Sequence, residues 1–166
     1  MEALSTLCYI EKDGHYLMLH RVKKKADINE GKWIGIGGHF EENESPDECL
    51  IREVREETGL TLTSFRLRGI VTFVSGKGAT EYMFLFTASA DISLTDPLPE
   101  CSEGDLAWIP IEKIKTLPIW EGDAVFLDLL AQNAPFFLLK LVYDENDVLT
   151  EAILDGKFIM PNQIPF

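Results

Sequence analysis

The sequence predicts an α/β protein, in which a mixed β-sheet is combined with about two main helices. Short runs rich in β-branched and aromatic residues recur along the chain between turn residues, which is typical of strands. Two other segments place apolar residues at helical spacing. The chain has 166 residues, and no internal repeat, low-complexity tract or Pro/Gly-rich linker divides it. We therefore expect a single domain that covers residues 1–166.

The first five predicted strands form a hairpin, a short strand and a second antiparallel pair. Apolar-rich runs at residues 6–11 and 16–21 flank an Asp-Gly turn, which predicts a β-hairpin. Residues 33–36 predict a third, short strand that ends in two glycines. Residues 65–74 and 82–90 are rich in β-branched and aromatic residues and are separated by a turn with two glycines. We expect these two strands to pair with each other.

The last third of the chain predicts the remaining elements. Residues 105–109 indicate a short strand, and residues 122–132 have the apolar spacing of a helix. Residues 136–143 and 148–154 indicate two strands around a polar turn. The sheet is therefore predicted to end in a C-terminal β-hairpin.

The charge of the chain excludes one class of partner. Acidic residues number 28 against 15 basic ones, which gives a net charge of −13. A surface that neutralises the phosphates of DNA or RNA needs the opposite sign, so we expect no long nucleic acid as a partner. A small phosphorylated ligand is compatible with this charge when a metal cation lies between its phosphates and the carboxylates.

Cysteine usage and hydropathy indicate a cytoplasmic protein. Cys8, Cys49 and Cys101 are odd in number and unpatterned, which predicts neither a disulfide framework nor a CxxC metal site. The N-terminus has no basic segment followed by an apolar stretch, and the longest apolar run, residues 136–139, is too short to span a bilayer. We therefore expect reduced thiols and no membrane association.

One helix is specified by signals at both of its ends. Ser45 and Glu48 form a capping-box pattern, and Pro46 stands at the first helical position between them. Gly59 is suited to the left-handed conformation that ends a helix. The helix is therefore predicted to run from Pro46 to the residue before Gly59.

This helix carries a stripe of three glutamates, Glu53, Glu56 and Glu57, beside an apolar stripe that would pack. Like charges at this spacing repel one another. One interpretation is a solvated acidic face, which is the commoner use of such a charge run. The other is a site for a hard divalent cation that bridges the carboxylates to a diphosphate.

The residues around the helix match the signature G-x5-E-x7-R-E-U-x-E-E-x-G-U of the Nudix family, where U is a bulky aliphatic residue. The match has no gap or mismatch and lies within residues 38–60, at Gly38, Glu44, Arg52, Glu53, Val54, Glu56, Glu57, Gly59 and Leu60. The chain therefore resembles Nudix hydrolases. The resemblance implies the Nudix fold, an α/β/α sandwich around a mixed β-sheet, and the hydrolysis of a phosphoanhydride with Mg²⁺ or Mn²⁺ as cofactor.

The resemblance also implies roles for the residues of the motif. Glu53, Glu56, Glu57 and the carbonyl oxygen of Gly38 are expected to bind the metal. One of the glutamates is expected to act as general base, and the sequence does not separate the two roles. Glycine at position 38, as at 37, lets the backbone approach the metal closely.

Three residues are expected to support or extend this site. Arg52 is expected to point away from the metal and to pair with Glu44, which would tie the glycine loop to the helix. Glu103 lies five residues before Trp108, where many Nudix enzymes place another carboxylate that faces the metal. The alternative for Glu103 is an ordinary loop glutamate.

Residues 31–38, and residues 120–123 followed by Phe136 and Phe137, resemble the corresponding segments of the MutT-type branch. This branch hydrolyses oxidised purine nucleoside triphosphates such as 8-oxo-dGTP, and the substrate is inferred from the resemblance. By this resemblance, Trp120 would stack on a purine and Asp123 would hydrogen-bond its edge. Trp33 is a further substrate-binding candidate, although core packing is the commoner use of both tryptophans. Vertebrate members carry asparagine after the equivalent of Trp33, and here that position is Ile34.

Several alternatives stay open. Arg21 is expected either to contact phosphate or to be a surface residue. A Nudix hydrolase of ADP-ribose or of dinucleoside polyphosphates is the second enzymatic hypothesis, and a Nudix module that senses a nucleotide without hydrolysing it is the third. The expected partner in each case is a small-molecule nucleotide, and a homodimer is compatible with the habit of the family.

Overall fold

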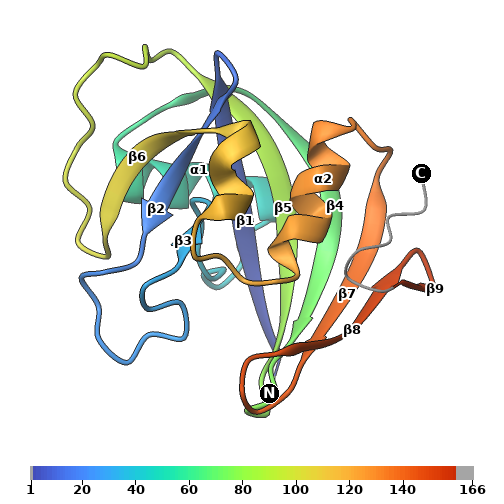
Figure 1. Ribbon diagram of the computed structural model, residues 1–166. Coiled ribbons are helices and arrows are strands. Elements are labelled where there is room, and N and C mark those ends of the chain that lie inside the picture. Colours follow the sequence, from blue (N-terminus) through green and yellow to red (C-terminus); the bar gives the residue numbers. More distant parts are fainter. Residues whose placement is uncertain (1, 160–166) are drawn as a thin grey trace.

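The protein has three layers in the computed structural model, which describes residues 2–159. Helix α1 (Pro46–Thr58) lies on one face of a β-sheet. Helix α2 (Asp123–Ala131) and a short 3₁₀ helix, η1 (Ile111–Thr116), lie on the other face (Figure 1). The predicted α/β/α sandwich is therefore confirmed. Residues 1 and 160–166 of the predicted single domain lie outside the described residues.

The sheet is mixed, as predicted. Within residues 2–159 it has nine strands: β1 (Glu2–Lys12), β2 (His15–His20), β3 (Trp33–Ile34), β4 (Leu62–Val74), β5 (Thr80–Ala90), β6 (Asp105–Pro110), β7 (Phe137–Tyr143), β8 (Leu149–Leu154) and β9 (Lys157–Ile159). The order is β3-β2-β1-β5-β4-β7-β8-β9, with β6 paired to β2. The β1–β5 and β4–β7 pairs are parallel, and the other pairs are antiparallel.

The predicted hairpins are present, although β1 and β4 begin four and three residues earlier than predicted. Three short elements also differ from the prediction. The hairpins β1–β2, β4–β5 and β7–β8 form as expected. The third strand ends at Ile34 rather than at Ile36, which forms only an isolated bridge with Cys8. Helix η1 and strand β9 are additions to the predicted set, because each is too short for apolar periodicity to reveal it.

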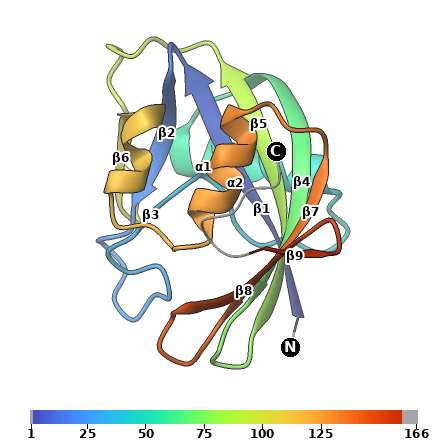
Figure 2. The same cartoon turned by 45° about the vertical axis from the view of Figure 1, so that its right-hand side comes forward.

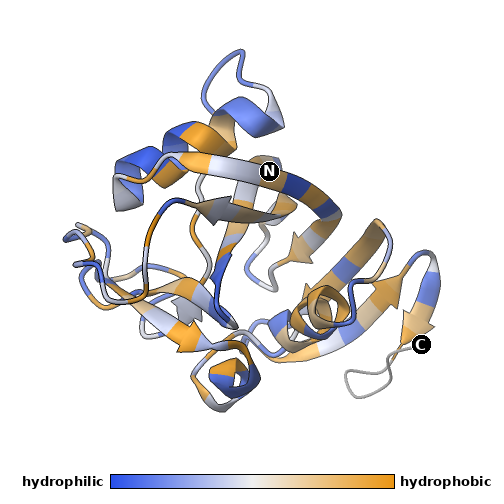
Figure 3. Ribbon diagram, turned by 90° about the horizontal axis from the view of Figure 1, so that it is seen from above, coloured by the Kyte–Doolittle hydropathy of each residue, from blue (hydrophilic) through white to orange (hydrophobic). Residues whose placement is uncertain are grey.

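Each face of the sheet has its own apolar core. Helix α1 contributes the fully buried Leu50 and Val54 to one core, and α2 contributes Phe126 and Leu129 to the other. Seen from above, the two helices lie on opposite sides of the sheet, and α1 shows both hydrophilic and hydrophobic residues (Figure 3). One side of α1 therefore packs, while its glutamates remain available for chemistry.

The tips of two hairpins meet at one end of the sheet (Figure 2). The backbone of Gly76, in the β4–β5 turn, lies so close to Asp144 that a Cβ atom at Gly76 would be 2.0 Å from the Asp144 carbonyl carbon. Lys77 Nζ contacts Asp147 Oδ2 at 3.3 Å. These contacts hold the ends of β4 and β7 together.

No helix within residues 2–159 is long and apolar enough to cross a membrane.

Candidate active site

The predicted caps of α1 are present at both ends. Ser45 Oγ accepts a hydrogen bond from the Glu48 N–H at 3.3 Å, and Glu48 Oε1 accepts one from the Ser45 N–H at 3.2 Å. Gly59 has a φ of 72°, in the left-handed region, and its N–H donates to the Arg55 carbonyl at 2.8 Å. Both ends of the glutamate-bearing helix are therefore fixed by local chemistry.

Gly37 and Gly38 allow the loop before α1 to pack tightly between β1 and the helix. A Cβ atom at Gly37 would lie 1.9 Å from the Thr6 carbonyl oxygen, and one at Gly38 would lie 2.6 Å from the Glu53 carboxylate. The Thr6 N–H donates to the Gly38 carbonyl at 3.0 Å. Any larger residue at either glycine would have to displace backbone or carboxylate.

Arg52 ties this loop to the helix through the pair that the sequence predicts. Its Nε donates to Glu44 Oε2 at 2.6 Å and its Nη2 donates to Glu44 Oε1 at 2.8 Å, which is a bidentate arrangement. Nη2 also donates to the His39 carbonyl at 3.0 Å. The hydrogen bonds from Arg52 lower the pKa of Glu44 to about 2, so this carboxylate stays ionised.

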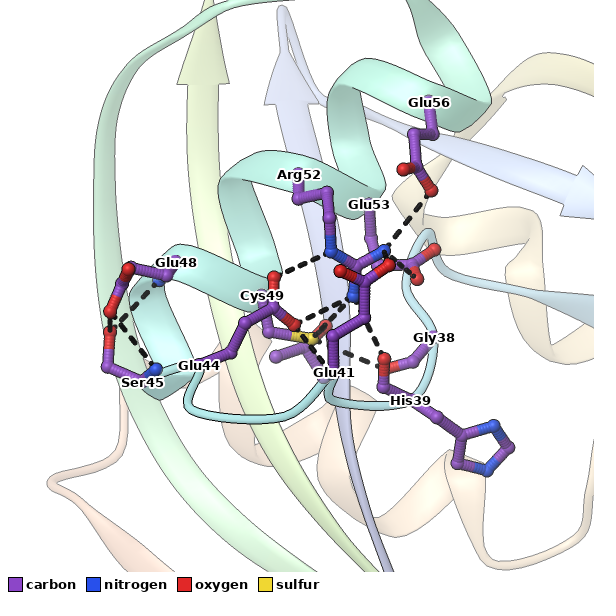
Figure 4. A network of polar contacts seen from close by, with 11 residues as sticks. Gly38, His39, Glu41, Glu44, Ser45, Glu48, Cys49, Arg52, Glu53 and Glu56 are labelled. Carbon is purple, nitrogen blue, oxygen red and sulfur yellow. Dashed lines mark hydrogen bonds and ion pairs between the residues drawn. The ribbon is translucent and has the colours of Figure 1, made fainter.

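The expected direction of Arg52 was wrong. Figure 4 shows its guanidinium directed toward the glutamate stripe as well as toward Glu44. Nη1 donates to Glu53 Oε1 at 2.8 Å and to Glu56 Oε2 at 3.2 Å. The physical reason is that Arg52 is one residue from Glu53 and four from Glu56, so its long side chain also reaches carboxylates that repel each other.

Glu57 is the most deeply buried of the three glutamates. Its exposed fraction is 9 %, and it accepts a hydrogen bond from the Gly37 N–H at 3.4 Å. Burial raises the pKa of Glu57 to about 8, and repulsion from Glu103 and Glu53 adds to the rise. Burial also raises the pKa of Glu53, against the opposing effect of Arg52. The carboxylates are thus crowded in a way that a cation would relieve.

Glu103 belongs to this group of carboxylates, and Arg21 holds it there. Arg21 is 8 % exposed, so the surface alternative is wrong for it. Its Nη1 contacts Glu103 Oε2 at 2.5 Å, while its Nε contacts Asp27 Oδ2 at 2.7 Å. Arg21 therefore connects the loop between β2 and β3 to the carboxylate that lies near Glu53 and Glu57.

The carboxylates suit a hard divalent cation by their donor chemistry. Carboxylate and carbonyl oxygens are the ligands that Mg²⁺ and Mn²⁺ prefer. Within residues 2–159, no three acidic, histidine or cysteine side chains already converge as a ligand set. Two observations therefore support a metal site here. The available side chains are of the type that binds a hard cation, and the backbone at Gly38 lies directly against the Glu53 carboxylate.

A cavity of about 710 Å³ joins these carboxylates to a group of aromatic and apolar residues. We refer to its two parts as the carboxylate end, formed by Glu53, Glu56, Glu57 and Glu103, and the aromatic end, formed by Asn29, Ile34, Phe73, Trp120 and Asp123. The volume is in the range of small-molecule sites. The two ends are lined by very different chemistry.

Trp120 is the centre of the aromatic end. Its ring packs edge-on against Phe73 and Tyr143 at centroid distances of 5.0 and 4.9 Å. Its Nε1 donates to Asn29 Oδ1 at 2.7 Å, and Lys32 Nζ lies 4.6 Å from the ring centroid. Trp120 is only 4 % exposed, so it is part of the apolar core as well as of the cavity wall.

Asp123 is a buried carboxyl at the same end. It is 5 % exposed and lines the cavity from the start of α2. Burial raises the pKa of Asp123 to about 8, although the charge of Lys32 opposes this shift. At neutral pH the group is therefore mostly protonated, so it can both donate and accept a hydrogen bond.

The expectation that Trp33 lines the substrate pocket is not met. Trp33 is absent from the cavity wall and stacks on His20 at 4.5 Å with an interplanar angle of 5°. Its neighbour Ile34 does line the cavity. Asp27 and Asn29 were not predicted from the sequence, because a polar residue in an irregular loop carries no periodic signal.

Sequence comparisons show which known proteins this chain resembles. The model of the NUDIX domain matches residues 1–130. An uncharacterized Nudix hydrolase of Bacillus subtilis, YvcI, is 34 % identical over 157 residues, which are 93 % of this chain and 95 % of that protein. An oxidized purine nucleoside triphosphate hydrolase of Danio rerio is 31 % identical over 152 residues, 92 % of this chain and 94 % of that one.

Solved structures show the same fold. The crystal structure of a MutT protein from Bacillus halodurans superposes with a TM-score of 0.78 at 24 % sequence identity. The match covers 92 % of this chain and 97 % of that protein. At this identity the likeness supports the fold, and the sequence relatives carry the family assignment.

Proposed function

Because this chain belongs to the Nudix family and is a hydrolase of phosphoanhydrides, we propose that it is a divalent-metal-dependent nucleoside triphosphate pyrophosphohydrolase. Its proposed substrates are oxidised purine deoxynucleoside triphosphates such as 8-oxo-dGTP, and its products are the nucleoside monophosphate and pyrophosphate. The observation that carries the proposal is a cavity in which a carboxylate end and an aromatic end lie together. This arrangement suits a ligand with phosphates at one end and a ring at the other.

The carboxylate end is the proposed reaction centre. Glu53, Glu56, Glu57 and the Gly38 carbonyl would hold Mg²⁺ or Mn²⁺, which supplies positive charge against the triphosphate when it is bound. Nudix hydrolases generally depend on a divalent metal. One of the glutamates accepts the proton of the attacking water, because hydrolysis of a phosphoanhydride needs a base beside the phosphorus.

Arg52 and Arg21 have positioning roles in this proposal. Arg52 holds Glu44 and the glycine loop against the helix, and Arg21 holds Glu103. Both arginines are already engaged by carboxylates, so phosphate contact by Arg21 would require it to leave Glu103 or Asp27. We therefore assign Arg21 to the orientation of carboxylates rather than to substrate phosphate.

The aromatic end is the proposed site of the purine. Ile34, Phe73 and Trp120 supply apolar and aromatic surface, which favours a flat ring over water. Asp123, largely protonated at neutral pH, offers a hydrogen bond without adding negative charge to the cavity. The relative in Danio rerio whose name states oxidized purine nucleoside triphosphates as its substrates supports this choice.

The domain that carries this activity is proposed to be the whole chain. All described strands join one sheet, and both helices pack on it. Strands β7, β8 and β9 lie beyond residue 130, where the family match ends. Tyr143 of β7 packs against Trp120, so β7 supports a residue of the cavity wall without lining the cavity itself.

A turnover panel tests the function. Protein with Mg²⁺ or Mn²⁺ is incubated with 8-oxo-dGTP, ordinary dNTPs, ADP-ribose and a dinucleoside polyphosphate, and the products are separated by chromatography. We expect the highest kcat/KM for 8-oxo-dGTP, with monophosphate and pyrophosphate released. Preferred hydrolysis of ADP-ribose or of the dinucleoside polyphosphate would contradict the substrate. Nucleotide binding without any turnover would contradict the enzyme and favour a sensing module.

A further inference from the structure

Asn29 lies at the aromatic end without a role in the function proposed so far. It is half-buried, lines the cavity, and belongs to the loop between β2 and β3. Its Oδ1 accepts the hydrogen bond from Trp120 Nε1 at 2.7 Å. No described residue accepts a hydrogen bond from its Nδ2 group. The side chain therefore has two N–H donors that the protein itself does not use.

The orientation of this amide is determined by its partner. The indole Nε1–H of Trp120 is only a donor, so the atom of Asn29 that faces it must be the oxygen. The amide nitrogen must then point to the other side of the planar group. With Oδ1 facing Trp120, Asn29 presents its two N–H donors on the remaining edge of the amide.

The loop holds Asn29 in place before any ligand arrives. The Glu30 N–H donates to the Asp27 carbonyl at 2.9 Å, and the Lys32 N–H donates to the Asn29 carbonyl at 2.9 Å, so two turns overlap at this residue. Asp27 is anchored in addition by the buried Arg21. A side chain on such a braced loop loses little further freedom when it binds a ligand.

The other residues of the aromatic end make Asn29 important for selection. The side chains of Ile34 and Phe73 have no hydrogen-bonding group. The single donor of Trp120, its Nε1–H, already donates to Asn29. Among the side chains of the aromatic end, only Asn29 and Asp123 therefore have groups left to hydrogen-bond with a flat ring. Asp123 can both donate and accept, so it does not by itself distinguish an oxo group from an amino group.

We propose that Asn29 is a specificity-determining residue, whose amide N–H groups read an oxo oxygen on the edge of the bound purine. When a purine presents an amino group to Asn29, the N–H donors of the purine face the N–H donors of Asn29. Neither group then has an acceptor in the partly desolvated cavity, which is unfavourable. The inference rests on the proposed function and specifies its substrate class: purines with oxo groups are preferred over purines with an amino group on that edge.

Two substitutions separate reading of the ring from support of Trp120. Asn29→Asp keeps an oxygen that can accept from Trp120 Nε1 but replaces the two donors by an acceptor. Asn29→Leu removes both hydrogen-bonding functions at similar size. Asn146→Asp, on the exposed turn between β7 and β8, is the matched control for the same chemical change outside the cavity. Thermal unfolding of each variant verifies the fold.

The measurement is the affinity of the product-like ligands 8-oxo-dGMP and dAMP by calorimetry, which does not require turnover. We expect wild-type protein to prefer 8-oxo-dGMP. Asn29→Asp should reduce the ratio of the two affinities by about tenfold or more, and Asn29→Leu should weaken 8-oxo-dGMP more than dAMP. Asn146→Asp should keep the wild-type ratio within about twofold.

The outcomes distinguish this inference from the proposed function. An unchanged ratio in both Asn29 variants, or wild-type protein that binds neither ligand, overturns the inference. Equal weakening of both ligands by Asn29→Leu, with the wild-type ratio kept by Asn29→Asp, assigns Asn29 to the support of Trp120 and also overturns it. A ratio that depends on Asn29 in a protein that hydrolyses no nucleoside triphosphate supports the inference while refuting the proposed function.

Discussion

The two ends of the cavity differ in how they treat charge. At the carboxylate end, Glu53, Glu56, Glu57 and Glu103 lie near one another, and burial with mutual repulsion raises the pKa of Glu57 to about 8. At the aromatic end, Asp123 has a pKa raised to about 8 by burial. At the first end several carboxylates crowd together, so a bound cation would relieve their mutual repulsion. At the second end Asp123 has no neighbouring carboxylate among the causes of its shift, and burial alone favours its protonated form.

This difference separates the chemistry from the selection of substrate. A cation and a base act on phosphates, which every nucleoside triphosphate carries, so damage to the carboxylate end should lower turnover of all substrates alike. The aromatic end contacts only the part of a nucleotide that varies. Damage there should change the ratio between substrates and leave the rate at saturation nearly intact.

The largest effect is expected for Glu57→Gln. Glutamine has nearly the shape of glutamate but neither binds a metal as a carboxylate nor accepts a proton, so kcat should fall by about 10²–10⁴-fold for every accepted nucleotide. The fold should persist, because the neutral glutamine has nearly the shape of Glu57 and places no charge in this buried position beside Glu53 and Glu103. Steady-state rates and thermal unfolding check the two statements. Wild-type turnover by this variant would place the active site elsewhere.

The second effect concerns the metal requirement and is expected for Arg52→Lys. Lysine keeps the charge but cannot make the bidentate pair of hydrogen bonds to both oxygens of Glu44. The glycine loop and Glu53 therefore lose their fixed positions. The Mg²⁺ concentration for half-maximal rate should rise by about 10–100-fold. Arg55→Lys, on the exposed side of the same helix, is the matched control. Equal metal dependence in both variants would contradict a positioning role for Arg52.

The third effect tests the aromatic end through Asp123→Ala. Removal of the carboxyl deletes a donor and an acceptor, so kcat/KM for 8-oxo-dGTP should fall on the order of tenfold to a hundredfold. The value of kcat at saturating 8-oxo-dGTP should change much less. Full kinetic curves for 8-oxo-dGTP and dATP provide both quantities. A uniform loss of kcat would mean that the two ends are not separable.

The sequence predicted the two ends unequally well for a physical reason. The carboxylate end comes from residues 38–60 and Glu103, and local rules of helix capping and helical spacing place Ser45, Gly59 and the glutamate stripe. The aromatic end is assembled from a loop, two strands, the segment before α2 and the start of α2 itself. Only the complete fold brings these segments together, and Asn29 therefore had no signal in the sequence.

Two errors have the same origin. The motif correctly paired Arg52 with Glu44, but it did not indicate that the guanidinium also reaches Glu53 and Glu56, because side-chain direction depends on neighbouring charges. The resemblance to the MutT-type branch predicts Trp33 as a substrate-binding residue, but its ring stacks on His20 outside the cavity wall. The sequence placed Arg52 and Trp33 on the correct segments of the chain. It did not determine which neighbours their side chains contact.

The smallest effect is a pH dependence of stability, measured by comparing wild-type protein with Asp123→Asn. Burial raises the pKa of Asp123 from 3.8 to about 8, and the nearby charged or ionisable groups that influence it are Lys32, Tyr9 and Tyr143. Between these values the unfolded chain has released the proton and the folded chain keeps it. The free energy of unfolding should therefore fall as pH rises toward 8, on the order of 1 kcal/mol per pH unit.

Asp123→Asn cannot titrate, so its stability should lack this component, and the difference in slope between the two proteins isolates it. Asp91→Asn, at an exposed carboxyl, is the matched control and should keep the wild-type slope. Chemical denaturation at several pH values from 5 to 8 provides the slopes. Parallel curves for wild type and Asp123→Asn would mean that Asp123 is ionised in the folded state. The aromatic end would then carry a negative charge like the carboxylate end, and the proposed division between them would be lost.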